Sequence, residues 1–160
     1  MSTSPIRPTD DEARVLAHSL MQQARFAALG VIDDHGAPMV TRVAFGRGPD
    51  GQPMTLVSDL SAHTRALKAR PQASLLVGEP ADKGDPLTHP RLTLQVRAQI
   101  VPHADPRYGD LAGHYLKTHP KAKLYIGFAD FNFMLFTPQL GLLNGGFGKA
   151  YELSAADLTP

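Results

Sequence analysis

Hydrophobic and polar residues alternate most regularly in the middle of the chain. Leu92, Leu94, Val96, Ala98 and Ile100 are separated by single polar residues, which gives a period of two over residues 92–100. A strand with this period has one buried face and one polar face, as is typical of antiparallel sheets. The pattern therefore predicts a long antiparallel strand here.

Shorter apolar stretches between turn-forming residues predict the remaining strands. They are residues 26–32, 39–45, 54–57, 73–77, 131–137 and 141–144. The stretch 131–137 is apolar on both faces, which is more than one small barrel interior buries. Its second face is therefore expected to need a partner, and the residues concerned are Phe131, Phe133, Met134, Leu135 and Phe136.

Helices are predicted at residues 9–23, 62–70, 105–117 and 121–125. Thr9 and Glu12 have the spacing of a capping box at the start of the first helix. Its inward stripe is expected to be Val15, Leu16, Ser19, Leu20 and Gln23. Six or seven antiparallel strands with a few helices predict a small barrel in a single domain, residues 1–160, with a helix in 1–24 and the barrel in 25–151.

Composition limits the binding partners, the side-chain chemistry and the compartment that we expect. The 160 residues contain 16 Lys plus Arg against 15 Asp plus Glu, so a net charge of +1 provides no global attraction for nucleic acid or an anionic membrane. The chain has no cysteine, which excludes disulfides, thiolate metal sites and cysteine nucleophiles. No secretory leader pattern or long apolar span is present, and we expect a soluble cytoplasmic protein.

The junction between strand 54–57 and helix 62–70 is the clearest candidate binding site. Free backbone N–H groups at a helix start bind anions, and this stretch adds the side chains of Ser58, Ser61, His63, Thr64 and Arg65. The plainer interpretation is that Ser61 caps the helix and the cations form a solvated face.

Arg42 adds a second cation in the middle of strand 39–45. An unpaired charge is costly to bury, so Arg42 is expected to meet an anion unless it reaches the barrel rim or pairs with a local carboxylate.

Side-chain chemistry alone gives no candidate enzyme. The seven histidines include no pair at helical metal-ligand spacing with an acidic partner, so we expect no metal site. No nucleophile-elbow motif occurs, and the glycines near residue 146 do not have dinucleotide-binding spacing. A bound cofactor that carries the reactivity is the remaining route to catalysis.

Several motifs in order resemble one family. They are 41–45 (TRVAF), 56–65 (LVSDLSAHTR), 71–77 (PQASLLV), 127–131 (GFADF) and 145–151 (GGFGKAY). Together they resemble the pyridoxamine 5'-phosphate oxidase-like FMN-binding split barrels, in the branch related to heme-utilisation proteins.

The resemblance implies a mainly β fold with flanking helices, a six-stranded antiparallel split β-barrel that forms a homodimer with FMN between the subunits. By position, Arg42, Ser58, His63 and Thr64 match the segments that hold the flavin phosphate, and Val43 and Asp59 match those along the ring and ribityl chain. Residues implied to approach from the partner subunit are Gly146, Phe147 and Lys149.

The function implied is an FMN-dependent oxidoreductase with no identified catalytic residue. The alternatives are a non-catalytic flavin- or heme-binding protein linked to heme utilisation and a deazaflavin-dependent reductase. The vitamin-synthesising oxidases open the long strand with Arg-Gln, whereas this chain has Arg91-Leu92, so we do not expect their activity. The heme-degrading relatives supply a C-terminal histidine, and because no histidine follows His119 we expect no histidine-ligated heme.

Overall fold

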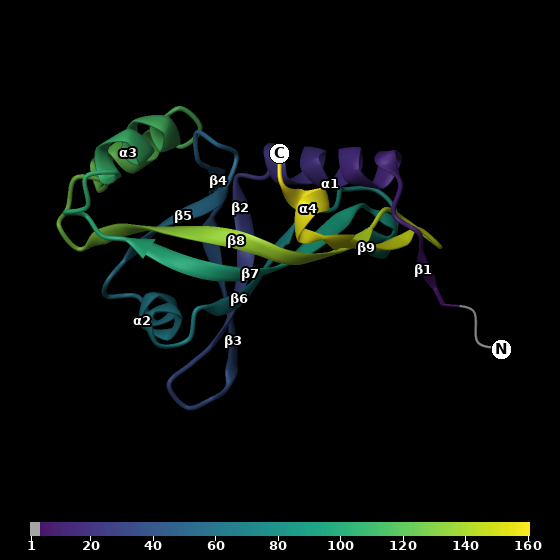
Figure 1. Ribbon diagram of the computed structural model, residues 1–160, viewed down its shortest axis with the longest axis horizontal. Coiled ribbons are helices and arrows are strands. Elements are labelled where there is room, and N and C mark those ends of the chain that lie inside the picture. The colour runs from purple at the N-terminus through teal and green to yellow at the C-terminus, as the bar shows by residue number, and fades with distance from the viewer. Residues whose placement is uncertain (1–3) are drawn as a thin grey trace.

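The computed structural model describes residues 4–160, and nine strands in that part form one sheet (Figure 1). Residues 1–3 of the predicted domain lie outside the described residues. The strands are β1 (Ile6–Arg7), β2 (Phe26–Ile32), β3 (Pro38–Ala44), β4 (Gly46–Arg47), β5 (Pro53–Ser58), β6 (Gln72–Val77), β7 (Arg91–Val101), β8 (Phe131–Asn144) and β9 (Ala150–Ser154).

The sheet curls into a split barrel. Its hydrogen-bonded order is β1-β9-β8-β7-β6-β2-β3, and β5 pairs with both β4 and β8. β3 and β5 contact each other without ladder pairing, which leaves the barrel split along that seam. The predicted class is confirmed: the six longer strands, β2, β3, β5, β6, β7 and β8, pair in antiparallel fashion, while β1 runs parallel to β9.

The helices lie on both sides of this sheet. They are α1 (Asp11–Gln23), α2 (Ala62–Ala69), α3 (Tyr108–Leu116) and α4 (Ala155–Leu158), with short 3-10 helices at Pro86–Thr88 and Pro120–Leu124. Figure 1 shows α1 and α3 along one side and α2 along the other. Within the described residues no helix is long and apolar enough to cross a membrane.

The start of α1 differs from the prediction. Asp10 is the N-cap, because its side chain accepts a hydrogen bond from the Ala13 N–H, and the capping box of Thr9 and Glu12 is not formed. Thr9 instead donates its hydroxyl to the carbonyl of Glu152 on β9 at 2.7 Å. The cap is therefore one residue later than predicted. The Thr9 hydrogen bond connects the segment before α1 to β9.

The buried face of α1 also differs. Ala13, Ala17 and Met21 are the buried residues of the helix, whereas Val15 from the predicted stripe is 70% exposed. Small alanines let α1 approach the sheet closely, and the period of four places Met21 on the same face. The prediction gave too much weight to the hydrophobicity of Val15 and too little to its place on the helix.

The second face of β8 is covered by the chain itself. Phe133 and Leu135 pack in a cluster with Tyr108, Leu111 and Tyr115 of α3, while alternate residues of β8 face the barrel core. Tyr108 donates its hydroxyl to the carbonyl of Ile126 at 2.7 Å. The inference that this face needs a second chain was therefore wrong, since α3 covers it.

β8 is a single strand where two were predicted. A bulge opposite Gln95 and Val96 absorbs the irregularity at Pro138, so pairing with β7 continues past it. The strand β9 and helix α4 were missing from the prediction. A capping box between Ser154 and Asp157 begins α4, and Asp157 also accepts a hydrogen bond from Arg14 of α1 at 2.8 Å.

Candidate functional site

The junction between β5 and α2 leaves backbone donors free, as the sequence predicted. Ser61 is the N-cap of α2 but makes no side-chain capping bond. Within the described residues the N–H groups of Ala62 and His63 also have no partner. Two free N–H groups and a free hydroxyl at the positive end of a helix favour an anion.

Ser61 and His63 line an open cavity of about 280 Å³. It lies where β3, β5, α2 and the segment before β8 meet. Its lining residues are Arg42, Val43, Ala44, Leu56, Val57, Ser58, Ser61, His63, Tyr125 and Phe131. We refer to it as the His63 cavity. The structure thus brings together Arg42, Val43, Ser58 and His63 of the predicted site.

His63 is half-buried in this cavity and is held by one hydrogen bond. Its Nδ1 lies 3.2 Å from the Thr41 hydroxyl oxygen. Burial lowers the pKa of the imidazole below its ordinary value of 6.5, so the neutral ring predominates at pH 7. Nε2 has no hydrogen-bond partner in the described part of the chain. A neutral imidazole with one nitrogen fixed and the other open is the usual form of a histidine metal ligand.

Two hydroxyl groups predicted to hold a phosphate are already engaged. Thr64 is fully buried and donates to the Ser58 carbonyl at 2.7 Å. Ser58 donates to the Asp130 carboxylate at 2.8 Å. The carboxylate of Asp130 also places negative charge beside the predicted anion site.

Asp59 likewise faces away from the His63 cavity. Its carboxylate accepts hydrogen bonds from Lys68 and from the buried Asn132, both at 2.8 Å. Its backbone N–H donates to the Asp130 carbonyl. Asp59 therefore ties α2 to the beginning of β8 and orients the junction.

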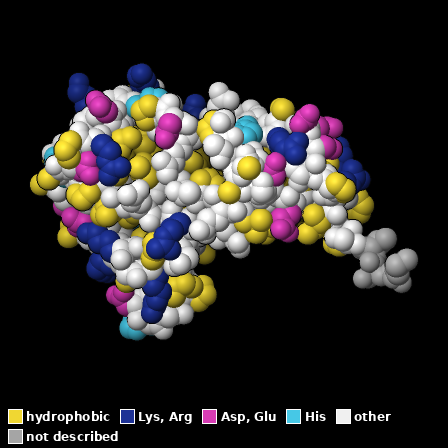
Figure 2. Space-filling model, in the orientation of Figure 1, with side chains coloured by type: hydrophobic (Ala, Val, Ile, Leu, Met, Phe, Trp, Pro, Cys, Tyr) yellow, Lys and Arg dark blue, Asp and Glu magenta, His cyan; other side chains and the backbone are white. Residues whose placement is uncertain are grey.

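Arg42 is exposed, as in the alternative that it reaches the barrel rim. Its guanidinium carbon lies 5.5 Å from the centre of the Phe26 ring, a cation–π contact with the neighbouring strand. No carboxylate lies within 4.0 Å of it in the described residues, so it remains available to an anion. Figure 2 shows further Lys and Arg side chains over α2 and beside the β2–β3 hairpin.

Gly146, Phe147 and Lys149 lie elsewhere, in the turn between β8 and β9. Ser58 pairs with Phe131 at one end of β8, and the turn follows the other end at Asn144. At roughly 3.3 Å per residue these ends are separated by about 40 Å along the strand. One chain therefore does not bring the two groups of predicted residues together. Phe147 is 97% exposed, so within the chain it has no packing role.

The fold and the strand-to-helix junction match a known family. The sequence model described as pyridoxamine 5'-phosphate oxidase matches residues 16–143, which is most of the chain. The chain belongs to the pyridoxamine 5'-phosphate oxidase-like family. The match runs from α1 to the end of β8 and includes every residue that lines the His63 cavity.

Several similar proteins have names that refer to heme. The chain is 35% identical over 117 residues to the non-canonical heme oxygenase HOZ, chloroplastic, of Arabidopsis thaliana, covering 72% of this chain and 34% of that protein. It is 26% identical to the heme oxygenase HutZ of Vibrio cholerae, covering 86% and 78%. A heme-binding protein of Mycobacterium smegmatis has a solved structure that matches with a TM-score of 0.82 and 25% identity, over 96% of this chain and 61% of that one. The chain thus spans about a third of the Arabidopsis protein and under two thirds of the mycobacterial one.

The sequence did not indicate the aromatic wall of the site. Tyr125 and Phe131 line the His63 cavity with their ring centres 5.0 Å apart, and Phe128 lies 6.3 Å from Phe131. The sequence showed the motif at 127–131 but not which segment of the chain it packs against. Only the pairing of β5 with β8 places these rings beside Ser58.

Proposed function

We propose that this chain is a heme-binding protein that acts in heme utilisation, with the heme seated at the His63 cavity. The observation that carries the proposal is His63, a half-buried imidazole that lines the cavity, with Nδ1 beside Thr41 and Nε2 without a hydrogen-bond partner in the described residues. The heme-named relatives support the same ligand.

The residues around His63 fit a heme. When Nδ1 donates to Thr41, Nε2 carries the lone pair that ligates iron. The rings of Tyr125 and Phe131, tilted 36° to each other, offer an apolar aromatic wall, and Arg42 offers a charged donor for a propionate group. Bound heme would supply an iron centre for oxygen or electron-transfer chemistry. This chain's residues would hold, orient and partly desolvate it.

His63 thereby takes a different role from the one inferred from the sequence. There it matched a phosphate-binding segment, and no histidine was expected to ligate heme. Burial disfavours the charged imidazolium, which makes His63 a poorer partner for phosphate and a better one for a metal.

A homodimer is part of the proposal. The His63 cavity, at about 280 Å³, is at or below the smallest usual size for an organic ligand site, so the ligand must extend beyond it. Val40 and Leu76 are 69% and 44% exposed, and their pairing with β2 places them on the same sheet face as Arg42. A second copy on this apolar face would cover the exposed part of the ligand.

The test is a titration of the purified protein with hemin, followed by absorbance. We expect a sharpened, shifted Soret band, and a loss of at least about tenfold in affinity for His63→Ala, since the axial ligand is removed. His35→Ala, which changes an exposed histidine in the β2–β3 turn, is the matched control. A spectrum equal to that of free hemin, or an unchanged affinity in His63→Ala, would contradict the proposal.

FMN is the second candidate, favoured by the free N–H groups of Ala62 and His63 beside Ser61 and Arg42. If FMN is the ligand, the affinity for FMN exceeds that for riboflavin, and Arg42→Ala weakens FMN binding by more than about 1 kcal/mol. Quenching of flavin fluorescence measures both. Equal binding of the two flavins would show that the junction holds no phosphate.

A further inference from the structure

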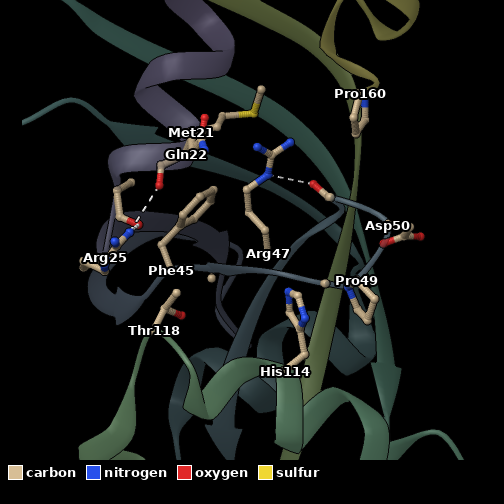
Figure 3. A pocket seen from close by; sticks show the side chains of 14 residues that line it. Met21, Gln22, Arg25, Phe45, Arg47, Pro49, Asp50, His114, Thr118 and Pro160 are labelled. Atoms are coloured by element: carbon tan, nitrogen blue, oxygen red, sulfur yellow. Dashed lines mark hydrogen bonds between the residues drawn. The ribbon is translucent and has the colours of Figure 1, made fainter.

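A second cavity lies between the end of α1, the β4–β5 hairpin and α3 (Figure 3). Its volume is about 460 Å³, and it shares no lining residue with the His63 cavity. Met21 and Phe45, each only 1% exposed, form its apolar floor. We refer to it as the Arg47 cavity.

Arg47 gives this cavity a charge that the chain does not neutralise. Its Nε donates to the Gly51 carbonyl at 2.8 Å, which is its one hydrogen bond in the described residues. No carboxylate lies within 4.0 Å of its guanidinium in residues 4–160. Burial lowers the pKa of Arg47, and no neighbouring acid opposes that shift. A half-buried cation with free donors and no counterion is costly unless an anion meets it.

Two backbone hydrogen bonds close the hairpin that carries Arg47. The N–H of Gly48 donates to Gln52 at 2.7 Å, and the N–H of Gly51 donates to Gly48 at 2.9 Å. Gly51 has a φ of 85°, and a Cβ there would lie 2.5 Å from the Pro160 ring. Glycine permits this turn, in which the Gly51 carbonyl holds Nε, and the terminal amino groups of Arg47 make no hydrogen bond in the described residues.

The charged side chains around the cavity favour an anionic ligand. Arg25 also lines the cavity, but one of its amino groups is engaged by the carbonyls at the end of α1, those of residues 22–24. Asp50 lies on the rim, and its carboxylate accepts a hydrogen bond from the Gln52 N–H. The lining Arg and Asp side chains are two cations and one anion, so their excess of one positive charge favours a monoanion, and the planar guanidinium of Arg47 matches the planar carboxylate.

From this arrangement we infer that the Arg47 cavity binds a small monocarboxylate with an apolar, ring-sized body. The carboxylate meets the terminal amino groups of Arg47, and the body lies over Phe45 and Met21. His114, whose ring makes no hydrogen bond in the described part of the chain, faces the same space from α3. The volume lies within the usual range for organic ligands. This site does not depend on heme or FMN.

The experiment uses benzoate as the probe and benzamide as its uncharged counterpart. Calorimetry gives the affinities, and the methyl resonance of Met21 in ¹H–¹³C spectra reports the location. We expect benzoate to bind with a Kd in about the millimolar range and to shift the Met21 resonance, and benzamide to bind at least about tenfold more weakly.

Variants of the two arginines test which cavity binds benzoate. Arg47→Gln should weaken benzoate binding by about tenfold or more, while Arg42→Gln, at the other cavity, should leave it unchanged. Equal binding of benzoate and benzamide, no shift at Met21, or full affinity in Arg47→Gln would each overturn the inference. If Arg47→Gln does not fold, the comparison of the two probes and the Met21 resonance of the natural chain still decide it.

Discussion

Each cavity is lined by one arginine from the same part of the chain, but the two arginines differ in burial and in their surroundings. Arg42 on β3 is exposed and lies over the Phe26 ring, beside a small open cavity. Arg47 on β4 is half-buried with no carboxylate near it, in a larger cavity whose floor belongs to the core. The His63 cavity is an open surface site, which under the proposed function a second chain would complete. The Arg47 cavity is complete within one chain.

The largest expected difference concerns stability. Phe45→Ala removes a buried ring from the floor of the Arg47 cavity and should lower the free energy of unfolding by about 3–5 kcal/mol. Tyr125→Ala, at the wall of the His63 cavity, removes a 37% exposed ring and should cost about 1 kcal/mol or less. Urea unfolding of both variants measures the difference. Equal losses would mean that both cavities belong to the same structural core.

The next prediction tests whether ligand binding at each cavity depends on a second chain. The double variant Val40→Glu, Leu76→Glu places charges on the exposed sheet face, so we expect monomers and a loss of about 100-fold in hemin affinity. Benzoate binding in the Arg47 cavity should not change. Sedimentation velocity and the two titrations measure these effects.

Val15→Glu, on the 70% exposed position of α1, is the matched control and should remain dimeric. A natural chain that sediments as a monomer at micromolar concentration would contradict the dimer. A double variant that binds hemin normally would show instead that one chain completes the His63 cavity.

A smaller effect is expected from the acid beside the His63 cavity. Asp130→Asn removes the negative charge that accepts the Ser58 hydroxyl, so affinity for an anionic ligand should rise by about fivefold, or roughly 1 kcal/mol. Titrations with hemin and with FMN report it. Asp34→Asn, in the exposed β2–β3 turn, should have no such effect. A fall in both affinities would show that Asp130 mainly positions Ser58.

The last prediction concerns the pH dependence of stability. Because the folded pKa of His63 is lowered, the unfolded chain takes up this proton first as pH falls below 6.5. The free energy of unfolding should therefore decrease from about pH 6.5 downward, by at most about 1.4 kcal/mol per pH unit for this group. His63→Gln should remove this contribution, and His35→Gln should retain it. Urea midpoints between pH 5 and 7 would show whether the slopes differ.

Local patterns determined much of the fold. The strict alternation at residues 92–100 predicted β7, because a half-buried strand needs apolar residues at every second position. The turn residues around Gly36 and Gly51, both at positive φ, predicted the hairpins that follow β2 and precede β5. The junction that carries Ser58 and His63 was predicted from the sequence because a strand end and a helix start are local features.

Contacts between distant parts of the chain decided the rest. Val15 is more hydrophobic than Ala17, yet Ala17 is buried, because close packing of α1 against the sheet favours a small side chain. The apolar second face of β8 indicated a partner, and only the folded chain shows that α3 covers it.

The same division applies to the two sites. The sequence determined the strands of the barrel and the strand-to-helix junction, since each depends on residues that are close along the chain, and the ordered motifs indicated the family. The tertiary structure placed Tyr125 and Phe131 beside Ser58, separated them from Gly146 and Phe147, and enclosed Arg47 between α1, α3 and the β4–β5 hairpin. Burial and charge pairing depend on which distant segments meet, and no local pattern contains that information.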